Sequence, residues 1–288
     1  MTLLLDGRAV SEKLRARIKE KVESFVRKGF RRPGLAVVLV GDDPASVVYV
    51  NNKRKACKKV GIESFFYHLP QDTPEGRLLS LIDELNKDER VDGILVQLPL
   101  PEQIDRLKVI EAIDPSKDVD GFHPQNMGLL VAQSEKGFIP CTPLGIDLLL
   151  RHYGIEVKGL NAVVVGAGFI VGRPLSLLLL WRNATPTVCH VYTKNLKEHT
   201  LKADLLVSAT GVPGLIRGDM VKEGAVVVDV GISRVGGKIV GDVVFDEVAP
   251  KARAITPVPG GVGPMTVTAL LLNTLKAYER HLSSTIKP

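Results

Sequence analysis

A tyrosine and a lysine lie four residues apart in a segment of the chain that carries helix signals. An aspartate and a proline start this segment and a glycine ends it, so residues 45–60 are predicted to form a helix. Tyr49 and Lys53 then share one face, where a lysine desolvated against an aromatic ring has a lowered pKa and can transfer protons. From this segment alone an ordinary basic helix is the better explanation, because the segment carries three further lysines: Lys55, Lys58 and Lys59.

Two other places offer polar groups beside apolar runs. Gln97 lies near the carboxyl end of residues 93–98, a predicted buried strand that prolines stop. Ligands of open α/β sheets bind beyond such strand ends, although Gln97 could equally satisfy a loop backbone. Asp118 and Asp120 precede Gly121, a pattern that supplies two carboxylates but often marks turn geometry alone.

A stiff segment precedes the last predicted helix. Residues 257–266 combine three prolines with Gly260, Gly261 and Gly263. Prolines hold a loop rigid and glycines let its backbone come close to a neighbour. Such a loop could lie against a flat ligand.

A glycine turn in the second half has the features of a nucleotide site. The apolar residues 162–165 lead into Gly166, Gly168 and Gly172, and the apolar run 175–181 follows. A strand, a tight turn and a helix in this order set a dinucleotide pyrophosphate on a helix N-terminus. The spacing is one residue longer than the common fingerprint, and a turn that binds nothing is the alternative. The strand before and the helix after supply the required context, which favours nucleotide binding.

The residues after the next predicted strand bear on the choice of cofactor. An NAD site normally places an acidic residue there, to accept from the ribose hydroxyls. The strand at residues 187–192 runs instead into Lys194, and the glycine turn carries Arg173. Cations suit a ribose phosphate, so the sequence leans slightly toward NADP.

Predicted strands and helices alternate along the whole chain, which is typical of parallel α/β sheets. In the first half we expect helices at 11–28, 45–60 and 75–86 and strands at 35–40, 64–68 and 93–98. In the second half we expect helices at 143–151 and 265–281 and strands at 162–165, 187–192, 204–208 and 225–230. Residues 117–139 contain several glycines and little periodicity, so they are a candidate connection between domains.

Composition narrows the class of protein. With 288 residues, 45% of them apolar, the chain is long enough for two domains, and no apolar run reaches the roughly 18 residues of a membrane span. No secretory leader is apparent, so a cytoplasmic location is expected. The net charge of +6 arises from interspersed charges of both signs, so neither nucleic acid nor a membrane is an expected partner.

The cysteines and histidines point to neither a disulfide framework nor a metal centre. Cys57, Cys141 and Cys189 are widely spaced and odd in number. The six histidines are scattered without a paired metal spacing. Metal catalysis is therefore not expected.

Taken together, these motifs closely resemble the bifunctional methylenetetrahydrofolate dehydrogenase/cyclohydrolase family. The resemblance covers essentially the whole chain, with several specific motifs in the family's order and at compatible spacing. The motifs are Tyr49-x-x-x-Lys53, the strand end Val96-Gln97-Leu98-Pro99, Asp118-Val-Asp120-Gly121, Pro140-Cys-Thr142-Pro143, the glycine turn with Val171-Gly172-Arg173-Pro174, and residues 257–266.

The resemblance implies two α/β domains with a cleft between them, the second a Rossmann-like parallel-sheet domain. We expect a folate-binding catalytic domain at residues 1–138, completed by the C-terminal helix 266–288, and an NAD(P)-binding domain at 139–265. It also implies a homodimer formed through the nucleotide domain.

The implied function is two reactions on tetrahydrofolate derivatives at one site. The first is NADP-linked oxidation of 5,10-methylenetetrahydrofolate to 5,10-methenyltetrahydrofolate, and the second is hydrolysis of that product to 10-formyltetrahydrofolate. By the resemblance, Lys53 is the catalytic lysine, Gln97 its partner, Tyr49 the ring that packs on the folate and Asp120 the carboxylate that holds the pterin. Further substrate-binding residues are Val96, Leu98, Pro99, Pro259, Gly260, Gly261, Val262 and Gly263. The implied cofactor-binding residues are Gly166, Ala167, Gly168, Gly172, Arg173, Lys194 and Ile232.

The chain departs from the family pattern around the cofactor. Many members have Gly-Arg-Ser or Gly-Ala-Ser where this chain has Gly166-Ala167-Gly168, and Ser or Arg, which hold the 2′-phosphate, where it has Val191 and Tyr192. NAD is therefore an alternative to NADP. Two other functions stay open. One is a two-domain dehydrogenase of the shikimate or amino-acid type, which has no reason to carry Tyr49, Gln97 and residues 257–266 together. The other is a nucleotide-sensing binding protein without turnover.

Overall fold

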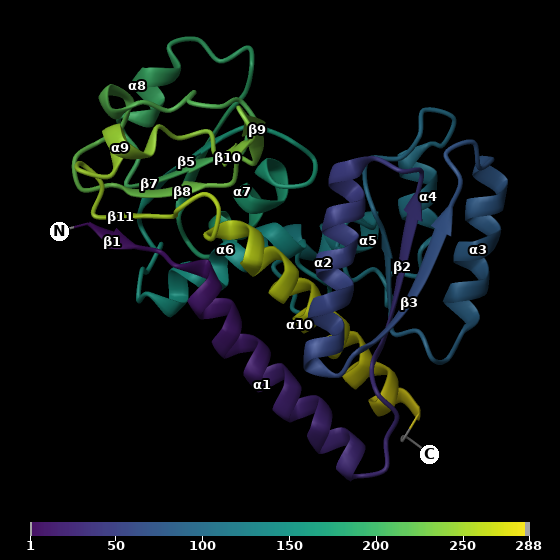
Figure 1. The fold of residues 1–288 in the computed structure, drawn as a ribbon. Coiled ribbons are helices and arrows are strands. Elements are labelled where there is room, and N and C mark those ends of the chain that lie inside the picture. The colour runs from purple at the N-terminus through teal and green to yellow at the C-terminus, as the bar shows by residue number, and fades with distance from the viewer. Residues whose placement is uncertain (1, 286–288) are drawn as a thin grey trace. The chain divides into compact units, whose positions relative to one another are not determined.

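The computed structural model describes residues 2–285, which form two compact α/β units (Figure 1). The three-stranded unit comprises Lys13–Cys141 and Val267–Pro288, and the six-stranded unit comprises Met1–Glu12 and Thr142–Thr266. Within residues 2–285, no helix combines the length and the apolar character that crossing a membrane requires.

The three-stranded unit is built on a parallel sheet in the order β3-β2-β4. The central strand β2 (Gly34–Val40) is buried along its whole length, as expected for a parallel strand covered on both faces. The other strands are β3 (Glu63–Leu69) and β4 (Gly93–Val96). Helix α2 (Pro44–Val60) connects β2 to β3, and α3 (Glu75–Lys87) connects β3 to β4. Two further helices, α4 (Arg106–Ala112) and α5 (Pro124–Val131), follow β4.

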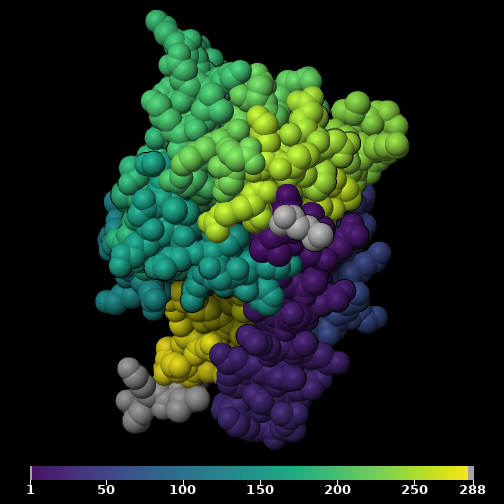
Figure 2. All heavy atoms as spheres, turned by 90° about the vertical axis from the view of Figure 1, so that its left-hand side faces the viewer, coloured from purple at the N-terminus to yellow at the C-terminus, as the bar shows by residue number. Residues whose placement is uncertain are grey.

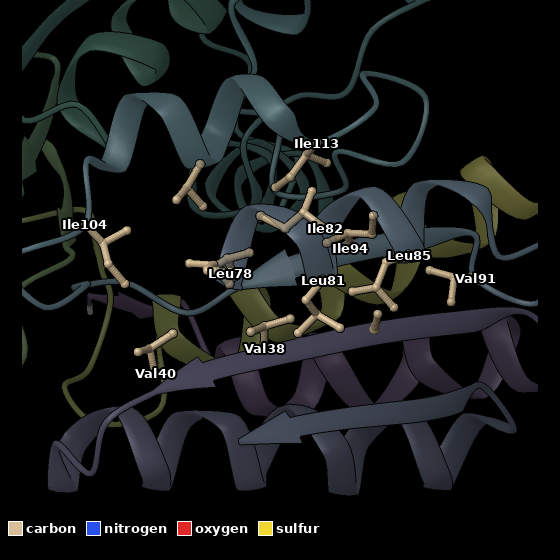
Figure 3. Packing of buried hydrophobic residues seen from close by; sticks show 13 residues of the cluster. Val38, Val40, Leu78, Leu81, Ile82, Leu85, Val91, Ile94, Ile104 and Ile113 are labelled. Atoms are coloured by element: carbon tan, nitrogen blue, oxygen red, sulfur yellow. The ribbon is translucent and has the colours of Figure 1, made fainter. Parts of the chain in front are cut away.

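One face of this sheet packs against α3 and α4 in an apolar core (Figure 3). Leu78 and Ile82 come from α3, and Val38 and Ile94 come from the strands. All four have no exposed side-chain surface, which makes them a main source of stability. This packing holds the carboxyl ends of β2 and β4 in place.

The long terminal helices α1 (Gly7–Arg27) and α10 (Val262–Thr285) begin in one unit and end in the other. In the three-stranded unit they lie side by side (Figure 2), where Arg15 Nε donates to Thr268 Oγ1 at 2.9 Å. Asn273 of α10 donates to Val119 O at 2.8 Å and to Ile139 O at 3.0 Å, which ties the helix to residues 117–139.

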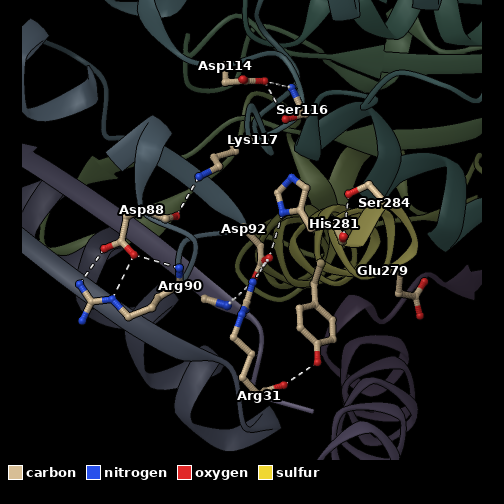
Figure 4. Close-up of polar contacts among 12 residues, drawn as sticks. Arg31, Asp88, Arg90, Asp92, Asp114, Ser116, Lys117, Glu279, His281 and Ser284 are labelled. Atoms are coloured by element: carbon tan, nitrogen blue, oxygen red, sulfur yellow. Dashed lines mark hydrogen bonds and ion pairs between the residues drawn. The ribbon is translucent and has the colours of Figure 1, made fainter. Parts of the chain in front are cut away.

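A buried aspartate joins α10 to the amino ends of the strands (Figure 4). Asp92 accepts two hydrogen bonds from Arg31, at 2.7 and 2.8 Å, and one from the backbone N–H of Gly34. His281 Nδ1 of α10 lies 2.9 Å from the same carboxylate, and the hydroxyl of the fully buried Tyr278 donates to Arg31 O. Helix α10 is thus an integral part of this unit.

The six-stranded unit contains a parallel sheet in the order β1-β11-β8-β7-β5-β6. Its strands are β1 (Leu3–Leu4), β5 (Asn161–Val165), β6 (Thr185–Cys189), β7 (Leu205–Ser208), β8 (Val226–Asp229) and β11 (Ala254–Ile255). A hairpin of β9 (Ser233–Val235) and β10 (Lys238–Val240) follows β8. The helices are α6 (Cys141–His152), α7 (Gly172–Trp181), α8 (Leu196–Thr200), α9 (Phe245–Val248) and the 3₁₀ turn η1 (Gly218–Met220). β6 pairs with one side of β5 and the next strand, β7, pairs with the other side. The order of strands therefore changes direction at β5, and the carboxyl ends of β5 and β7 form a topological switch point, the usual ligand site of such sheets.

The expected class of two α/β domains, the second with a Rossmann-like parallel sheet, is confirmed. The compact units divide at residues 141/142, and the first twelve residues belong to the six-stranded unit because β1 pairs with β11. Residues 117–139 are not a connection between domains: they contain α5 and lie within the three-stranded unit. Strand β6 ends at Cys189, so the expected extension to residue 192 is wrong.

Candidate active site

Lys53 is positioned by helix α2 and by the strand end that follows β4. The N-cap Asp43 accepts from the Ser46 N–H at 2.8 Å, and Gly61 ends the helix with φ +81°. Lys53 is half-buried and its Nζ donates to Gln97 Oε1 at 3.0 Å. The other three lysines of the helix are exposed, so the structure separates Lys53 from the ordinary basic surface. Those lysines are Lys55, Lys58 and Lys59.

Gln97 is held so that its carbonyl oxygen faces the lysine. It follows β4 directly, is 8% exposed, and its backbone N–H donates to Val38 O at 2.9 Å. Its side-chain Nε2 donates to Leu98 O at 2.7 Å. Because a backbone carbonyl only accepts, the amide nitrogen must face Leu98 and the oxygen must face Lys53.

Asp120 belongs to the same group of side chains. Its pKa is raised to about 6 by desolvation, against the opposing effect of the nearby Lys53 charge, while the charge of Asp118 raises it further. Cys141 Sγ lies 3.8 Å from Asp120 Oδ1 and 3.4 Å from Val119 O. Lys53 Nζ therefore contacts the Gln97 amide, and its charge acts on the Asp120 carboxyl. Tyr49, 40% exposed, lies one helical turn before the lysine.

Asp118 has a structural role, as the turn interpretation of this segment expects. It is buried, and desolvation raises its pKa. Its carboxylate accepts from Asn126 Nδ2 and from the His123 N–H, both at 2.8 Å, and from the Gly121 N–H at 3.2 Å. Cys141 is the residue that sequence reasoning missed here: its motif was noticed, but only the fold brings it beside Asp120.

The remaining residues expected to bind substrate differ in their surroundings. Val96 is 6% exposed and packs in the core of the three-stranded unit. Leu98 is half-buried and Pro99 is exposed beside Gln97. The expected substrate residues of segment 257–266 lie in the six-stranded unit.

The glycines of segment 257–266 serve mainly to pack the loop. A Cβ on Gly7, at the start of α1, would lie 1.8 Å from Gly261 O, and the Arg8 N–H donates to Gly260 O at 3.1 Å. Gly260 has φ +113°, which a side chain rarely adopts. Gly263 is different: a Cβ there would lie 3.9 Å from Ile232 Cδ1, so the structure brings an expected substrate residue and an expected cofactor residue together. Val262 is buried and Pro259 is exposed.

The glycine turn after β5 has the geometry of a pyrophosphate cradle. Gly166 has φ +111°, and a Cβ there would lie 2.3 Å from Ala209 O at the end of β7. A Cβ on Gly172 would lie 1.8 Å from Gly166 O, whereas a Cβ on Gly168 would meet no atom within 4 Å. Helix α7 starts at Gly172 without a side-chain N-cap, so no capping side chain competes with an anion for the N-terminus of the helix.

Beyond the turn, the surface offers cations and exposed apolar side chains. Arg173 is exposed and its Nε donates to Ala167 O at 3.0 Å, which holds it on the turn. Lys194 is exposed, and Val191 and Tyr192 are 90% and 86% exposed after the end of β6. These residues fit a phosphorylated nucleotide. The described residues contain no group of three or more His, Cys, Asp or Glu side chains that could hold a metal ion.

Two family models match the chain, one over each half. The model of the tetrahydrofolate dehydrogenase/cyclohydrolase catalytic domain matches residues 5–120, and that of the tetrahydrofolate dehydrogenase/cyclohydrolase NAD(P)-binding domain matches residues 140–282. The bifunctional protein FolD of Aquifex aeolicus (strain VF5) is 70% identical over 291 residues, which cover 100% of both chains.

Solved structures agree with these matches. The bifunctional enzyme FolD from Campylobacter jejuni superposes with a TM-score of 0.96 at 53% identity, covering 97% of this chain and 99% of that one. The FolD of Trypanosoma brucei, complexed with NADP cofactor and inhibitor, superposes with a TM-score of 0.93 at 40% identity over 98% of both chains. The shikimate 5-dehydrogenase of Thermus thermophilus reaches a TM-score of 0.54 at 19% identity over 86% of this chain and 99% of that one, which shows a common fold alone.

Proposed function

The chain belongs to the tetrahydrofolate dehydrogenase/cyclohydrolase family, and from that premise we propose how its own residues carry out the family's two reactions. It is a bifunctional enzyme that oxidises 5,10-methylenetetrahydrofolate to 5,10-methenyltetrahydrofolate with NAD(P) and hydrolyses the product to 10-formyltetrahydrofolate. The contact between Lys53 Nζ and Gln97 Oε1 is the observation that carries the residue assignment.

The hydrolysis needs groups that move protons. Water adds to the methenyl carbon and loses one proton, and the hydroxyl of this adduct loses a second as the bond from carbon to N5 breaks. N5 takes up one proton, so one is released in each turnover. Lys53 relays these protons, because among the described residues it is the amine that donates a hydrogen bond to Gln97. This hydrogen bond orients the ammonium group of Lys53.

Asp120 and Tyr49 hold the folate. A carboxylate accepts hydrogen bonds from the N–H groups of a pterin, and a pKa of about 6 leaves Asp120 ionised at neutral pH. Tyr49 exposes part of its ring beside Lys53, where it can stack on the substrate. Leu98 and Pro99 complete the edge of this surface after Gln97.

The six-stranded unit holds the nucleotide, which supplies the hydride acceptor when bound. The turn from Gly166 to Gly172 and the uncapped N-terminus of α7 bind the pyrophosphate. Arg173 and Lys194 bind the 2′-phosphate of NADP in place of the family's usual groups. Ile232 and Gly263 contact the reactive end of the cofactor; a Cβ built on Gly263 would lie 3.9 Å from Ile232 Cδ1.

Replacing the lysine tests the central assignment. Lys53→Met removes the proton relay, so cyclohydrolase kcat falls by about 10²-fold or more, the usual contribution of general acid–base catalysis. Lys55→Met, on the exposed side of the same helix, is the matched control and keeps the activity within about twofold, as surface changes usually do. Full cyclohydrolase activity in purified Lys53→Met would overturn the assignment.

The cofactor preference has its own test. We expect kcat/KM with NADP to exceed that with NAD, and Arg173→Ala combined with Lys194→Ala to lower kcat/KM for NADP while leaving NAD nearly unchanged. Equal losses for both cofactors would contradict a phosphate-binding role for these two cations.

The assembly and the location of the protein are also part of the proposal. A homodimer formed through the six-stranded unit is supported by β6, an edge strand of the sheet among the described residues, on which Val188 is 39% exposed. Three buried free thiols support a cytoplasmic location. Sedimentation velocity at micromolar concentration tests the dimer, and a monomer there would contradict it.

A further inference from the structure

Two buried carboxylates lie at the carboxyl edge of the six-stranded sheet, outside the residues assigned so far. Asp229 is the last residue of β8 and is 4% exposed. Asp242 lies between β10 and α9 and is fully buried. Desolvation by burial raises the pKa of Asp229 to about 6 against the backbone N–H groups of Val243, Asp242 and Gly231, which lower it; the charge of Asp242 is a smaller raising effect. The role of the two carboxylates follows from the hydrogen bonds they accept.

Asp242 holds the loop that follows β7. Its Oδ2 accepts from Ser208 Oγ at 2.9 Å, from the Thr210 N–H at 2.7 Å and from Thr210 Oγ1 at 2.9 Å. Ser208 is the last residue of β7. Three donors from two residues fix the direction in which the loop leaves the strand.

This loop reaches the glycine turn through a single residue. Ala209 lies between the two residues that Asp242 binds, and its N–H donates to Val165 O at 2.8 Å. Its carbonyl oxygen is the atom that a Cβ on Gly166 would meet at 2.3 Å. The loop that Asp242 holds therefore borders the turn proposed to bind the pyrophosphate.

Asp229 fixes Asp242 and a second loop. Its Oδ1 accepts from the Asp242 N–H at 3.0 Å and from the Gly231 N–H at 2.9 Å, and its Oδ2 accepts from the Val243 N–H at 3.0 Å. Gly231 precedes Ile232, which is 48% exposed. One pair of carboxylates thus sets both loops that border the proposed cofactor site.

The fit leaves no room for adjustment. A Cβ on Gly231 would lie 2.1 Å from Asp242 Oδ1, and a Cβ on Gly241 would lie 1.9 Å from Asp229 Oδ2. Asp242 Oδ1 has no hydrogen-bond partner among residues 2–285, so all of the bonding of this side chain is directed at Ser208 and Thr210.

We propose that Asp242 is a positioning residue for the nicotinamide cofactor: it holds the loop after β7 against the glycine turn, and Asp229 holds it in register with the loop that carries Ile232. The inference rests on the proposed cofactor site of this unit. It predicts an effect on NAD(P) binding that leaves the hydrolysis of supplied methenyltetrahydrofolate unchanged, because that reaction needs no nicotinamide.

The decisive variant is Asp242→Ala in the full chain. Loss of three hydrogen bonds to a carboxylate raises KM for NAD(P) about tenfold or more, while cyclohydrolase kcat/KM stays within about twofold. Asp242→Asn restores most of the cofactor affinity, because its carbonyl oxygen can still accept from Ser208 and Thr210.

A control separates positioning from loss of stability. Asp147 is 8% exposed in the same unit. Its carboxylate accepts from Arg182 Nε at 3.0 Å and from Arg182 Nη2 at 2.9 Å. Asp147→Ala lowers the melting temperature of the unit and leaves KM for NAD(P) unchanged. An equal rise in KM for Asp147→Ala and Asp242→Ala would overturn the proposal.

A second pair of variants covers the case in which Asp242→Ala does not fold. Thr210→Val removes one of the three bonds and weakens NAD(P) binding severalfold, and Thr210→Ser restores it. Isothermal titration with NADP and with NAD, without folate, measures the affinity directly. Wild-type affinity in both Asp242→Ala and Thr210→Val would overturn the positioning role alone, whereas no binding of either nucleotide to the unmodified protein would overturn the cofactor site and this role with it.

Discussion

Lys53 is one of four lysines on α2, and its surroundings alone distinguish it. The neighbouring lysines point to solvent, whereas Lys53 meets the oxygen of Gln97 at 3.0 Å. The sequence contains both residues and the motifs around them, but 44 positions separate the lysine from the glutamine. The two candidate residues could therefore be predicted from the sequence, while the contact between them, which gives them a function, depends on the fold.

The environment of Asp120 predicts a pH dependence of substrate binding. Its pKa of about 6 lies above the ordinary value of an aspartate, so the carboxyl is protonated below pH 6 and ionised above it. If the carboxylate accepts from the pterin, KM for methenyltetrahydrofolate rises as the pH falls through about 6. Steady-state kinetics between pH 5 and 8 measure this step.

The variant Asp120→Asn shows whether the step belongs to this residue. An amide does not titrate, so its KM is raised at pH 7.5 and stays flat across the range. A step of the same size and position in Asp120→Asn would assign the titration to another group.

At the scale of elements, the turn between β5 and α7 shows two kinds of glycine. Gly166 has a positive φ and lies against Ala209 O, whereas a Cβ on Gly168 would meet nothing. Gly166→Ala should therefore destabilise the protein by about 1 to 3 kcal/mol and weaken NAD(P) binding, because the strain falls on the turn itself. Chemical denaturation and nucleotide titration measure the two effects.

Gly168→Ala is the matched control for this prediction. Its extra methyl group fits the open space at this position, so stability changes by less than about 0.5 kcal/mol. Equal destabilisation by the two substitutions would show that the tight approach to Ala209 is absent in solution.

Elements with local sequence signals could be predicted, whereas segments ordered by residues distant in the sequence could not. The expected helix 45–60 matches α2 to within one residue, because its cap, proline and terminal glycine are local signals. Residues 117–139 looked like a connection because glycines and polar residues fill them. Their order comes from buried hydrogen bonds such as that of Asn126 to Asp118 and from α10, which no local pattern reveals.

For the whole molecule, the two units should respond separately to a change in one of them. Tyr278 is fully buried in the three-stranded unit, and Tyr278→Ala should cost about 3 to 5 kcal/mol there, as core aromatic truncations do. The single tryptophan, Trp181, lies in the six-stranded unit and reports on it by fluorescence. In Tyr278→Ala, the urea concentration at which half of the cyclohydrolase activity is lost should fall further below its wild-type value than the urea midpoint of the Trp181 fluorescence change.

Asp147→Ala is the opposite change, because it weakens the unit that carries Trp181. It should lower the fluorescence midpoint more than the activity midpoint. If each variant moved both midpoints by the same amount, the two units would unfold as one and this prediction would fail.

Pairing of β1 with β11 also constrains the order in which the protein can be completed. Leu3 pairs with Ala254, and Thr2 Oγ1 donates to Ala249 O, 247 residues further along the chain. During translation, β1 therefore emerges from the ribosome long before its partner β11 has been synthesised. All three strands of the three-stranded sheet are synthesised in the interval. The six-stranded sheet can be closed at this edge only after Ala254 and Ile255 have been synthesised.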